Sequence, residues 1–196
     1  MENFLNKGKV TRNKIITSAL HLFATKGYEQ TSMREIAIEV DIKAPSLYAY
    51  CSSKEELFGI VCDYVTNDYL NFVRDQSDEI SSFSVDKKLY TLMRSLNEYV
   101  YENDLGHFIN RYFLFPPDPF RGTFVQLYKQ TEEEIKKIIG KAIDSEPERF
   151  ISANTVIASF MCVIDGMIFQ MLNFSRDEYE NKLEETWKVF WRGIQK

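Results

Sequence analysis

The sequence predicts an all-α protein of about nine helices. Apolar residues recur at three- and four-residue spacing along most of the chain, serine and glutamate stand at capping spacing before two of these segments, and no stretch shows the sustained two-residue alternation of a strand. The chain has 196 residues, of which 44% are hydrophobic, with only eight glycines and five prolines. It is therefore long enough and apolar enough to bury a core.

The first part of the chain predicts four helices. The first ends before Gly27, a residue typical of a helix C-terminus. Ser32 and Glu35 have the spacing of a capping box, and Ser53 and Glu56 repeat it. The predicted spans are 9–26, 32–40, a short helix with Pro45 in its first turn, and a helix from 53 toward 73.

The rest of the chain predicts five further helices. The polar stretch that follows residue 74 is interpreted as a linker, and prolines mark two of the later joints. The predicted spans are 85–102, 105–115, 119–143, 147–173 and 177–194.

The charge is divided unevenly along the chain. The whole sequence has a net charge of -5, which argues against a general nucleic-acid binder such as a histone. Residues 1–54 hold eight basic and five acidic side chains, a balance of +3, and the remainder carries −8. A basic end on an acidic body indicates that a nucleic-acid partner would meet the N-terminal part.

The three cysteines, Cys51, Cys62 and Cys162, form neither an even set nor a C-x-x-C pair, so a disulfide framework or a metal site is not expected. The N-terminus lacks the apolar stretch of a signal peptide. The apolar region 153–172 is interrupted by Asn154, Asp165 and Gln170, so a membrane span is not expected either. These features predict a cytoplasmic protein with no metal, cofactor or membrane partner.

Residues 32–51 have the pattern of a helix-turn-helix motif. Two short helices follow a longer one, and a tight turn at Asp41 joins them. Aspartate tolerates the left-handed backbone conformation that such turns often need. In this motif the second short helix enters the major groove of DNA, so the exposed side chains of this segment are candidate DNA contacts.

The same segment resembles the DNA-binding domain of the TetR family of bacterial transcriptional regulators. The resemblance covers about 50 residues and depends on Arg12, Ile15-Ile16, Ala19, Leu22-Phe23, Gly27-Tyr28, Thr31-Ser32, Ile36-Ala37, Ser46-Leu47-Tyr48, Tyr50, Ser53-Lys54 and Leu57. Asp41, Pro45 and Cys51 depart from the family's usual glycine, glycine and aromatic residue.

The resemblance implies a DNA-binding domain at 9–69 and a ligand-binding and dimerisation domain at 70–196. It also implies a homodimer that binds a palindromic operator in double-stranded DNA and responds to a small-molecule effector. The candidate DNA-binding residues are Thr31, Ser32, Arg34, Lys43, Ala44, Pro45, Ser46, Tyr48, Tyr50 and Lys54.

The C-terminal part supplies candidate effector and dimer residues. Aromatic and methionine side chains at helical spacing belong first to a core, but some of them can line a pocket with Asp165 as a polar anchor or as a structural hydrogen-bonding group. The candidate ligand-binding residues are Met93, Phe108, Tyr112, Phe124, Tyr128, Met161, Asp165 and Phe169. The candidate dimer residues are Phe160, Leu183, Trp187, Phe190 and Trp191.

From the sequence we predict a repressor that is released by a lipophilic or aromatic inducer. An enzyme is not expected, because the chain has two histidines and no nucleophile-elbow, zinc-protease or phosphate-loop motif, and no catalytic residue is assigned. The alternative is a DNA-bound organising protein or an activator that has no small-molecule inducer.

Overall fold

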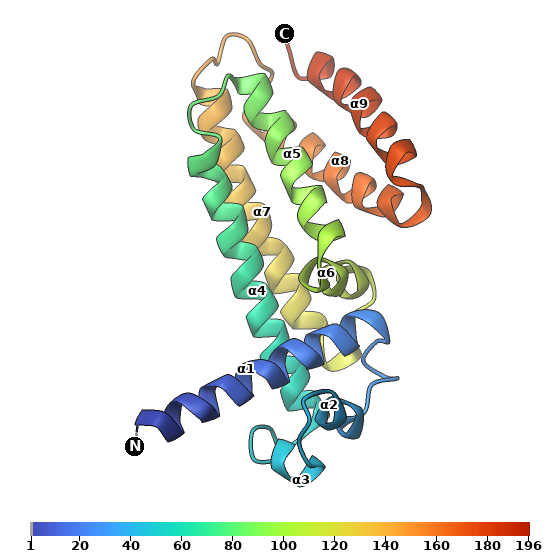
Figure 1. The fold of residues 1–196 in the computed structure, drawn as a ribbon. Helices are drawn as coiled ribbons and strands as arrows, with labels where there is room; N and C mark the ends of the chain where they lie inside the picture. The colour runs from blue at the N-terminus through green and yellow to red at the C-terminus, as the bar shows by residue number, and fades with distance from the viewer. Residues whose placement is uncertain (1) are drawn as a thin grey trace. The chain divides into compact units, whose positions relative to one another are not determined.

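The computed structural model describes the backbone of residues 2–196 and the side chains of residues 8–101, 103–171 and 173–196. Within this range the chain forms nine α-helices and one short 3-10 helix, which confirms the all-α prediction (Figure 1). The helices pack into two units. Unit 1 comprises residues 1–68 and 103–125, and unit 2 comprises residues 69–102 and 126–196.

Unit 1 contains the N-terminal helices together with a later segment. Its elements are α1 (Glu2–Thr25), α2 (Met33–Glu39), α3 (Ala44–Leu47), the first part of α4 (Lys54–Glu79), α6 (Asp104–Leu114), η1 (Asp118–Phe120) and the start of α7 (Arg121–Asp144). The sequence predicted a single division at residues 69 and 70. The packing instead places residues 103–125 with the N-terminal helices.

An aromatic cluster forms the core of unit 1. The fully buried ring of Phe58, on α4, lies at its centre, with centroid distances of 5.0 Å to Phe23 and 4.6 Å to Phe120. The rings of Phe108 and Tyr112 of α6 lie 5.3 and 5.1 Å from it. Large aromatic side chains bury much apolar surface, so this cluster joins α1, α4, α6 and η1 into one body.

Helix α6 also holds the C-terminal end of α1 through polar contacts. The Arg111 guanidinium donates to the carbonyl oxygens of Ala24 (2.8 Å) and Thr25 (3.0 Å), and the Tyr112 hydroxyl donates to the carbonyl oxygen of Phe23 (3.0 Å). The last carbonyl groups of a helix have no partners within the helix. Arg111 and Tyr112 therefore act as a tertiary cap on α1.

Gly27 ends α1 next to this cap. Its φ of 96° lies in the left-handed region, and an added Cβ would lie 3.2 Å from Nε of Arg111. Glycine suits this position because of both the backbone conformation and the limited space.

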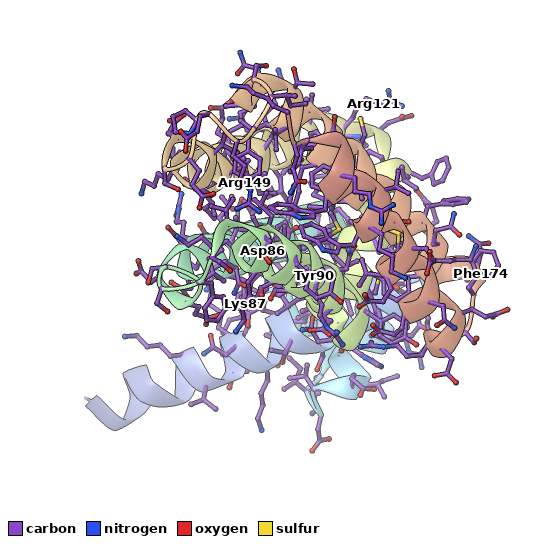
Figure 2. The ribbon with its side chains drawn as sticks, turned by 90° about the horizontal axis from the view of Figure 1, so that it is seen from above. Asp86, Lys87, Tyr90, Arg121, Arg149 and Phe174 are labelled. Carbon is purple, nitrogen blue, oxygen red and sulfur yellow. The ribbon has the colours of Figure 1, made fainter. Side chains whose placement is uncertain are left out.

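Unit 2 is built from the second part of α4, α5 (Val85–Glu102), most of α7, α8 (Ala153–Asn173) and α9 (Arg176–Gly193). Helix α8 packs against α5 and α9. Buried residues of all five helices form the core, including Val73, Leu89, Ile135, Phe160 and Leu183. Figure 2 shows this unit from above, with Asp86, Lys87 and Tyr90 along α5.

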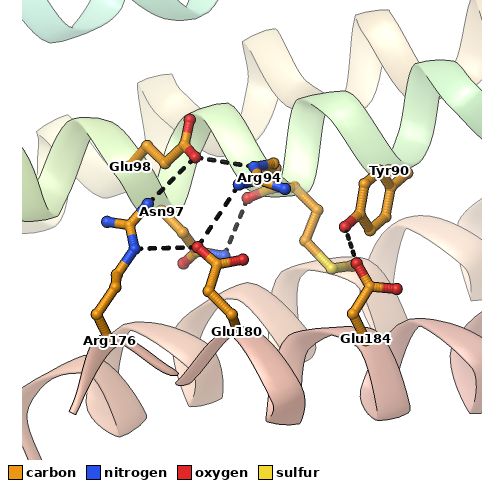
Figure 3. Close-up of polar contacts among 8 residues, drawn as sticks. Tyr90, Arg94, Asn97, Glu98, Arg176, Glu180 and Glu184 are labelled. Atoms are coloured by element: carbon orange, nitrogen blue, oxygen red, sulfur yellow. Dashed lines mark hydrogen bonds and ion pairs between the residues drawn. The ribbon is translucent and has the colours of Figure 1, made fainter. Parts of the chain in front are cut away.

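A charged network joins α5 to α9 in unit 2 (Figure 3). Nε of Arg94 lies 2.8 Å from Glu98, and Nε of Arg176 lies 3.0 Å from Glu180. The contacts Arg94 to Glu180 (3.6 Å) and Arg176 to Glu98 (3.4 Å) close the ring, and the Tyr90 hydroxyl donates to Glu184 beside it. Networked charges fix the pairing of two helices better than isolated surface ion pairs do.

Three predicted helix boundaries are wrong by several residues. Helix α1 begins at Glu2 and not at residue 9. Helix α4 continues to Glu79, so part of the stretch interpreted as a linker is helical. Helix α8 begins at Ala153 and not at residue 147, because Ser152 caps it by accepting from the amide of Thr155 (3.2 Å). Residues 149–151 instead pair with the C-terminal end of the chain, where the Ile151 amide donates to the Ile194 carbonyl (3.0 Å).

Helix α8 meets the length and composition criteria of a membrane span, which was not expected from the sequence. By length and apolar composition alone, Ala153–Met171 would suffice to cross a membrane, although its apolar runs are interrupted. In unit 2 the helix buries Val156, Phe160, Ile164 and Met171 among neighbouring helices, which is how a core helix uses such a composition. Its other face is exposed.

Candidate DNA-binding site

The helix-turn-helix of unit 1 is fixed by a left-handed turn. Asp41 has a φ of 59°, and no other described non-glycine residue has a positive φ. The amide of Ile42 donates to the carbonyl of Ala37 (2.9 Å), while Ile36, Ala37 and Leu47 are buried between the short helices. Asp41 therefore adopts the left-handed backbone conformation for which glycine is the more common residue.

The start of α2 is a complete capping box, as predicted. The hydroxyl of Ser32 accepts from the Glu35 amide (3.2 Å), and the Glu35 carboxylate accepts from the Ser32 amide (2.8 Å). The Ser32 hydroxyl also donates to Glu35 (2.8 Å), and Lys26 lies 2.9 Å from the same carboxylate. These contacts fix the orientation of α2 beside the C-terminus of α1.

The candidate DNA-binding residue Thr31 makes its side-chain hydrogen bonds within unit 1. Its side chain is only 1% exposed, and its hydroxyl donates to the carbonyl oxygens of Gly27 (2.8 Å) and Leu22 (3.2 Å). A buried hydroxyl needs such a partner. Thr31 therefore joins α1 to the start of α2.

The capping box predicts a stability change in acid. Hydrogen bonds from Lys26 and then Ser32 lower the pKa of Glu35 from 4.5 to about 2. A lowered pKa stabilises the folded state above the unfolded pKa, and this contribution is lost as the pH falls from about 4.5 to about 2. We expect Glu35→Gln to be less stable than the wild type at neutral pH, with the difference shrinking over that interval. Urea unfolding at several pH values measures it, and a pH-independent difference contradicts the assignment.

The exposed surface of α3 carries most of the remaining candidate residues. Lys43, Pro45, Ser46 and Tyr48 are exposed, with Tyr48 at 52%, while Ala44 and Tyr50 are partly buried. Arg34 is exposed on α2. Leu47 is fully buried and anchors the helix, so the polar residues on either side of it face solvent. Hydroxyl and cationic groups in this arrangement can donate to phosphates and base edges.

Lys54 is used partly within unit 1. Its ammonium donates to the carbonyl oxygen of Tyr28 (2.8 Å) and lies 4.4 Å from the centroid of the Tyr28 ring. A phosphate contact by Lys54 can therefore use only those N–H donors of its ammonium group that are not already engaged with Tyr28. No local sequence pattern indicates this second role, because Tyr28 is 26 residues away.

The eight candidate ligand-binding residues are divided between the two units. Phe108, Tyr112 and Phe124 belong to the aromatic core of unit 1. Met93 and Met161 are buried in unit 2, whereas Phe169 is 55% exposed. Tyr128 and Asp165 form a pair in unit 2, in which the tyrosine hydroxyl donates to the carboxylate at 2.7 Å.

Asp165 was predicted to be a polar anchor in a pocket or a structural hydrogen-bonding group. The residue is exposed, on the outer side of α8. Partial desolvation by its neighbours nevertheless raises the pKa of its carboxyl group, against the hydrogen bond from Tyr128. Its position fits the structural hydrogen-bonding role at least as well as that of an anchor inside a pocket.

The candidate dimer residues also differ in accessibility. Phe160, Leu183 and Phe190 are buried within unit 2, so a partner could not reach them without rearrangement. Trp187 and Trp191 are partly exposed and stack on each other with a centroid distance of 5.5 Å. The sequence therefore identified the apolar helices, but three of the five candidate dimer residues lie on helix faces that are buried within unit 2.

The comparisons with known proteins agree with the geometry. Residues 15–60 match the family described as "Bacterial regulatory proteins, tetR family". The "Biofilm operon icaADBC HTH-type negative transcriptional regulator IcaR" of Staphylococcus aureus (strain Newman) is 29% identical over 137 residues, which cover 68% of this chain and 69% of that protein. The IcaR of Staphylococcus epidermidis is 33% identical over 75 residues, 38% of this chain and 40% of that one.

Two solved structures share the fold over nearly the whole chain. A TetR-family transcriptional regulator from Mesorhizobium loti has a TM-score of 0.73 at 17% identity and covers 96% of this chain and 98% of its own. The regulator FadR from Bacillus subtilis, in complex with stearoyl-CoA, has a TM-score of 0.72 at 15% identity, covering 92% and 98%. Residues 15–60 therefore form a DNA-binding domain of the TetR family, and the chain as a whole is similar to bacterial transcriptional regulators of that family.

Proposed function

We propose that the protein is a repressor that binds a palindromic operator as a homodimer in the cytoplasm and is released by a small lipophilic or aromatic effector. The observation that carries the DNA-binding part is the exposed row Lys43, Ser46 and Tyr48, presented by a helix whose Leu47 is buried. The relative IcaR is named as a negative regulator, which supports repression over activation.

The exposed face of α8 supports the homodimer. Ala158, Cys162 and Gly166 follow one another at four-residue spacing on this face, and Phe169 continues it. A groove of about 310 Å³ runs beside them, between α8 and α9, and includes Met167 and Lys182 in its lining. Small residues allow two helices to approach closely, and a two-fold axis would pair this face with itself.

Buried polar groups support an effector in unit 2. The side-chain oxygens of Gln76 and Asn97 and the hydroxyl of Thr131 are buried and have no hydrogen-bond partner among the described residues. Such groups are costly in an apolar core, and a bound molecule with hydrogen-bonding groups would satisfy them. FadR, a structural neighbour, holds stearoyl-CoA, so that ligand is the first one to test.

Operator binding is measured with a labelled duplex from the region upstream of the protein's own gene. We expect Lys43→Ala and Tyr48→Phe each to weaken binding, because each removes a donor from the α3 surface, by about 1 kcal/mol or more per contact. Pro119→Ala, at an exposed position away from α3, serves as the control. If both variants bind with wild-type affinity, the assignment of the α3 surface is wrong.

The effector is tested with the same duplex. Addition of stearoyl-CoA or of uncharged aromatic compounds is expected to release the wild-type protein, since an effector acts through its different affinities for two states. A screen in which no compound changes operator affinity favours the organising protein without an inducer.

A further inference from the structure

The first helix extends well beyond the segment that packs in unit 1. Helix α1 begins at Glu2 and has 24 residues, whereas among its described side chains, those of residues 8–25, the buried ones begin only at Ile15. Val10 is 51% exposed, and nothing lies within 4 Å of the position that a Cβ on Gly8 would occupy. Figures 1 and 2 both show the first turns of α1 running out clear of the other helices of this unit.

Two cations continue the packed face of α1 into this projecting part. Phe23, Ala19 and Ile16 are buried and follow one another at spacings of four and three residues. Continued toward the N-terminus, the same spacing reaches Arg12 and Lys9. Residues at three- and four-residue spacing share one face of a helix, so Arg12 and Lys9 lie on the side of α1 that faces the rest of unit 1.

The two cations are available for a partner. Both are exposed, and no hydrogen bond or ion pair among the described side chains involves either of them. Lys14 is exposed as well, but its position on the helical wheel is opposite the buried face. The chain thus provides a control cation on the same helix.

We propose that Arg12 and Lys9 form a second phosphate-binding surface, which contacts the DNA backbone beside the segment read by α3. In Figure 1 the N-terminal end of α1 descends toward the level of α3 within unit 1, so both surfaces can meet one duplex. An arginine and a lysine are the donors that phosphate oxygens accept, without dependence on base sequence. The inference rests on DNA binding by unit 1 and not on the operator or effector.

Salt dependence distinguishes this surface from a solvated helix end. Each cation that neutralises a phosphate releases condensed counterions, and its removal lowers the slope of log affinity against log salt by about 1. We expect Arg12→Ala to lower the slope by about 1 per bound chain, and Lys9→Ala/Arg12→Ala by about 2. Lys14→Ala removes the same charge from the opposite face and is expected to leave the slope unchanged.

The measurement uses fluorescence anisotropy of full-length protein on two duplexes of equal length, the upstream region and an unrelated sequence. Circular dichroism confirms that each variant keeps its helices, and Arg12→Lys is expected to keep the slope. If the wild type does not prefer the upstream duplex, the operator proposal fails, while the slope on the unrelated duplex still tests the second surface. An Arg12→Ala slope equal to that of the wild type or of Lys14→Ala overturns the inference.

Ethylation interference locates the contacts. Wild-type protein is expected to lose binding when phosphates outside the bases contacted by α3 are ethylated, and the double variant is expected to be insensitive there. Identical interference patterns for the two proteins would mean that Arg12 and Lys9 meet something other than DNA, such as an acidic protein surface, and would also overturn the inference.

Discussion

Gly166→Arg is expected to convert the proposed homodimer to a monomer and to lower its affinity for the proposed operator at least about 100-fold, because two linked half-site contacts become one. The exposed Gly166 lies in α8, and no atom lies within 4 Å of the position that a Cβ would occupy. Arginine is also a better helix residue than glycine. The substitution should therefore leave the single chain folded while it obstructs a partner on this face.

Sedimentation velocity gives the oligomeric state and anisotropy gives the operator affinity. Gly140→Arg is the matched control, because Gly140 also lies within a helix of unit 2 with open space around its Cβ position. This control should remain a dimer with wild-type affinity. A Gly166→Arg protein that is still dimeric would show that the chain associates through another face.

Phe58→Ala is expected to destabilise unit 1 by about 3–5 kcal/mol, the range found when a buried phenylalanine is truncated in a close-packed core. The Phe58 side chain is fully buried and its ring contacts those of Phe23, Tyr28, Phe108 and Tyr112. These partners come from three other parts of unit 1. Loss of the ring therefore removes the common contact among α1, α4 and α6.

Thermal unfolding and operator binding together check this result. Phe58→Leu keeps most of the buried volume and is expected to cost markedly less than Phe58→Ala. Phe72→Ala, on the part of α4 that belongs to unit 2, tests whether the effect is local to unit 1. If Phe58→Ala unfolds at the wild-type temperature, the aromatic cluster is not the principal core of this unit.

The helix-turn-helix could be predicted because its determinants are local. The Ser32 to Glu35 capping box involves residues three apart, and the Asp41 turn depends on the conformation that one residue tolerates. Ile36, Ala37 and Leu47 are buried, and the hydrophobic periodicity that predicts this extends over only a few turns of helix. The predicted fold class and the first helices are therefore confirmed, apart from shifts in their ends.

The roles of individual polar side chains could not be predicted in the same way. Thr31 and Lys54 had the residue types and the positions of phosphate donors, yet their donors reach carbonyl groups at the end of α1 and in the loop after it. Arg111 caps α1 from 87 residues away, and nothing in the local sequence of α6 indicated that role. A side chain's free donors depend on what the fold brings near it.

The sequence by itself determined the all-α fold, the position of the helix-turn-helix and the basic character of its end, because helix periodicity, capping and charge are properties of neighbouring residues. Only the tertiary structure decided that residues 103–125 belong with unit 1, that Phe160 is covered while Phe169 is exposed, and that Asp165 lies on the outer side of α8. An apolar helix has more than one face that could be buried, and packing between segments distant in the sequence selects among them.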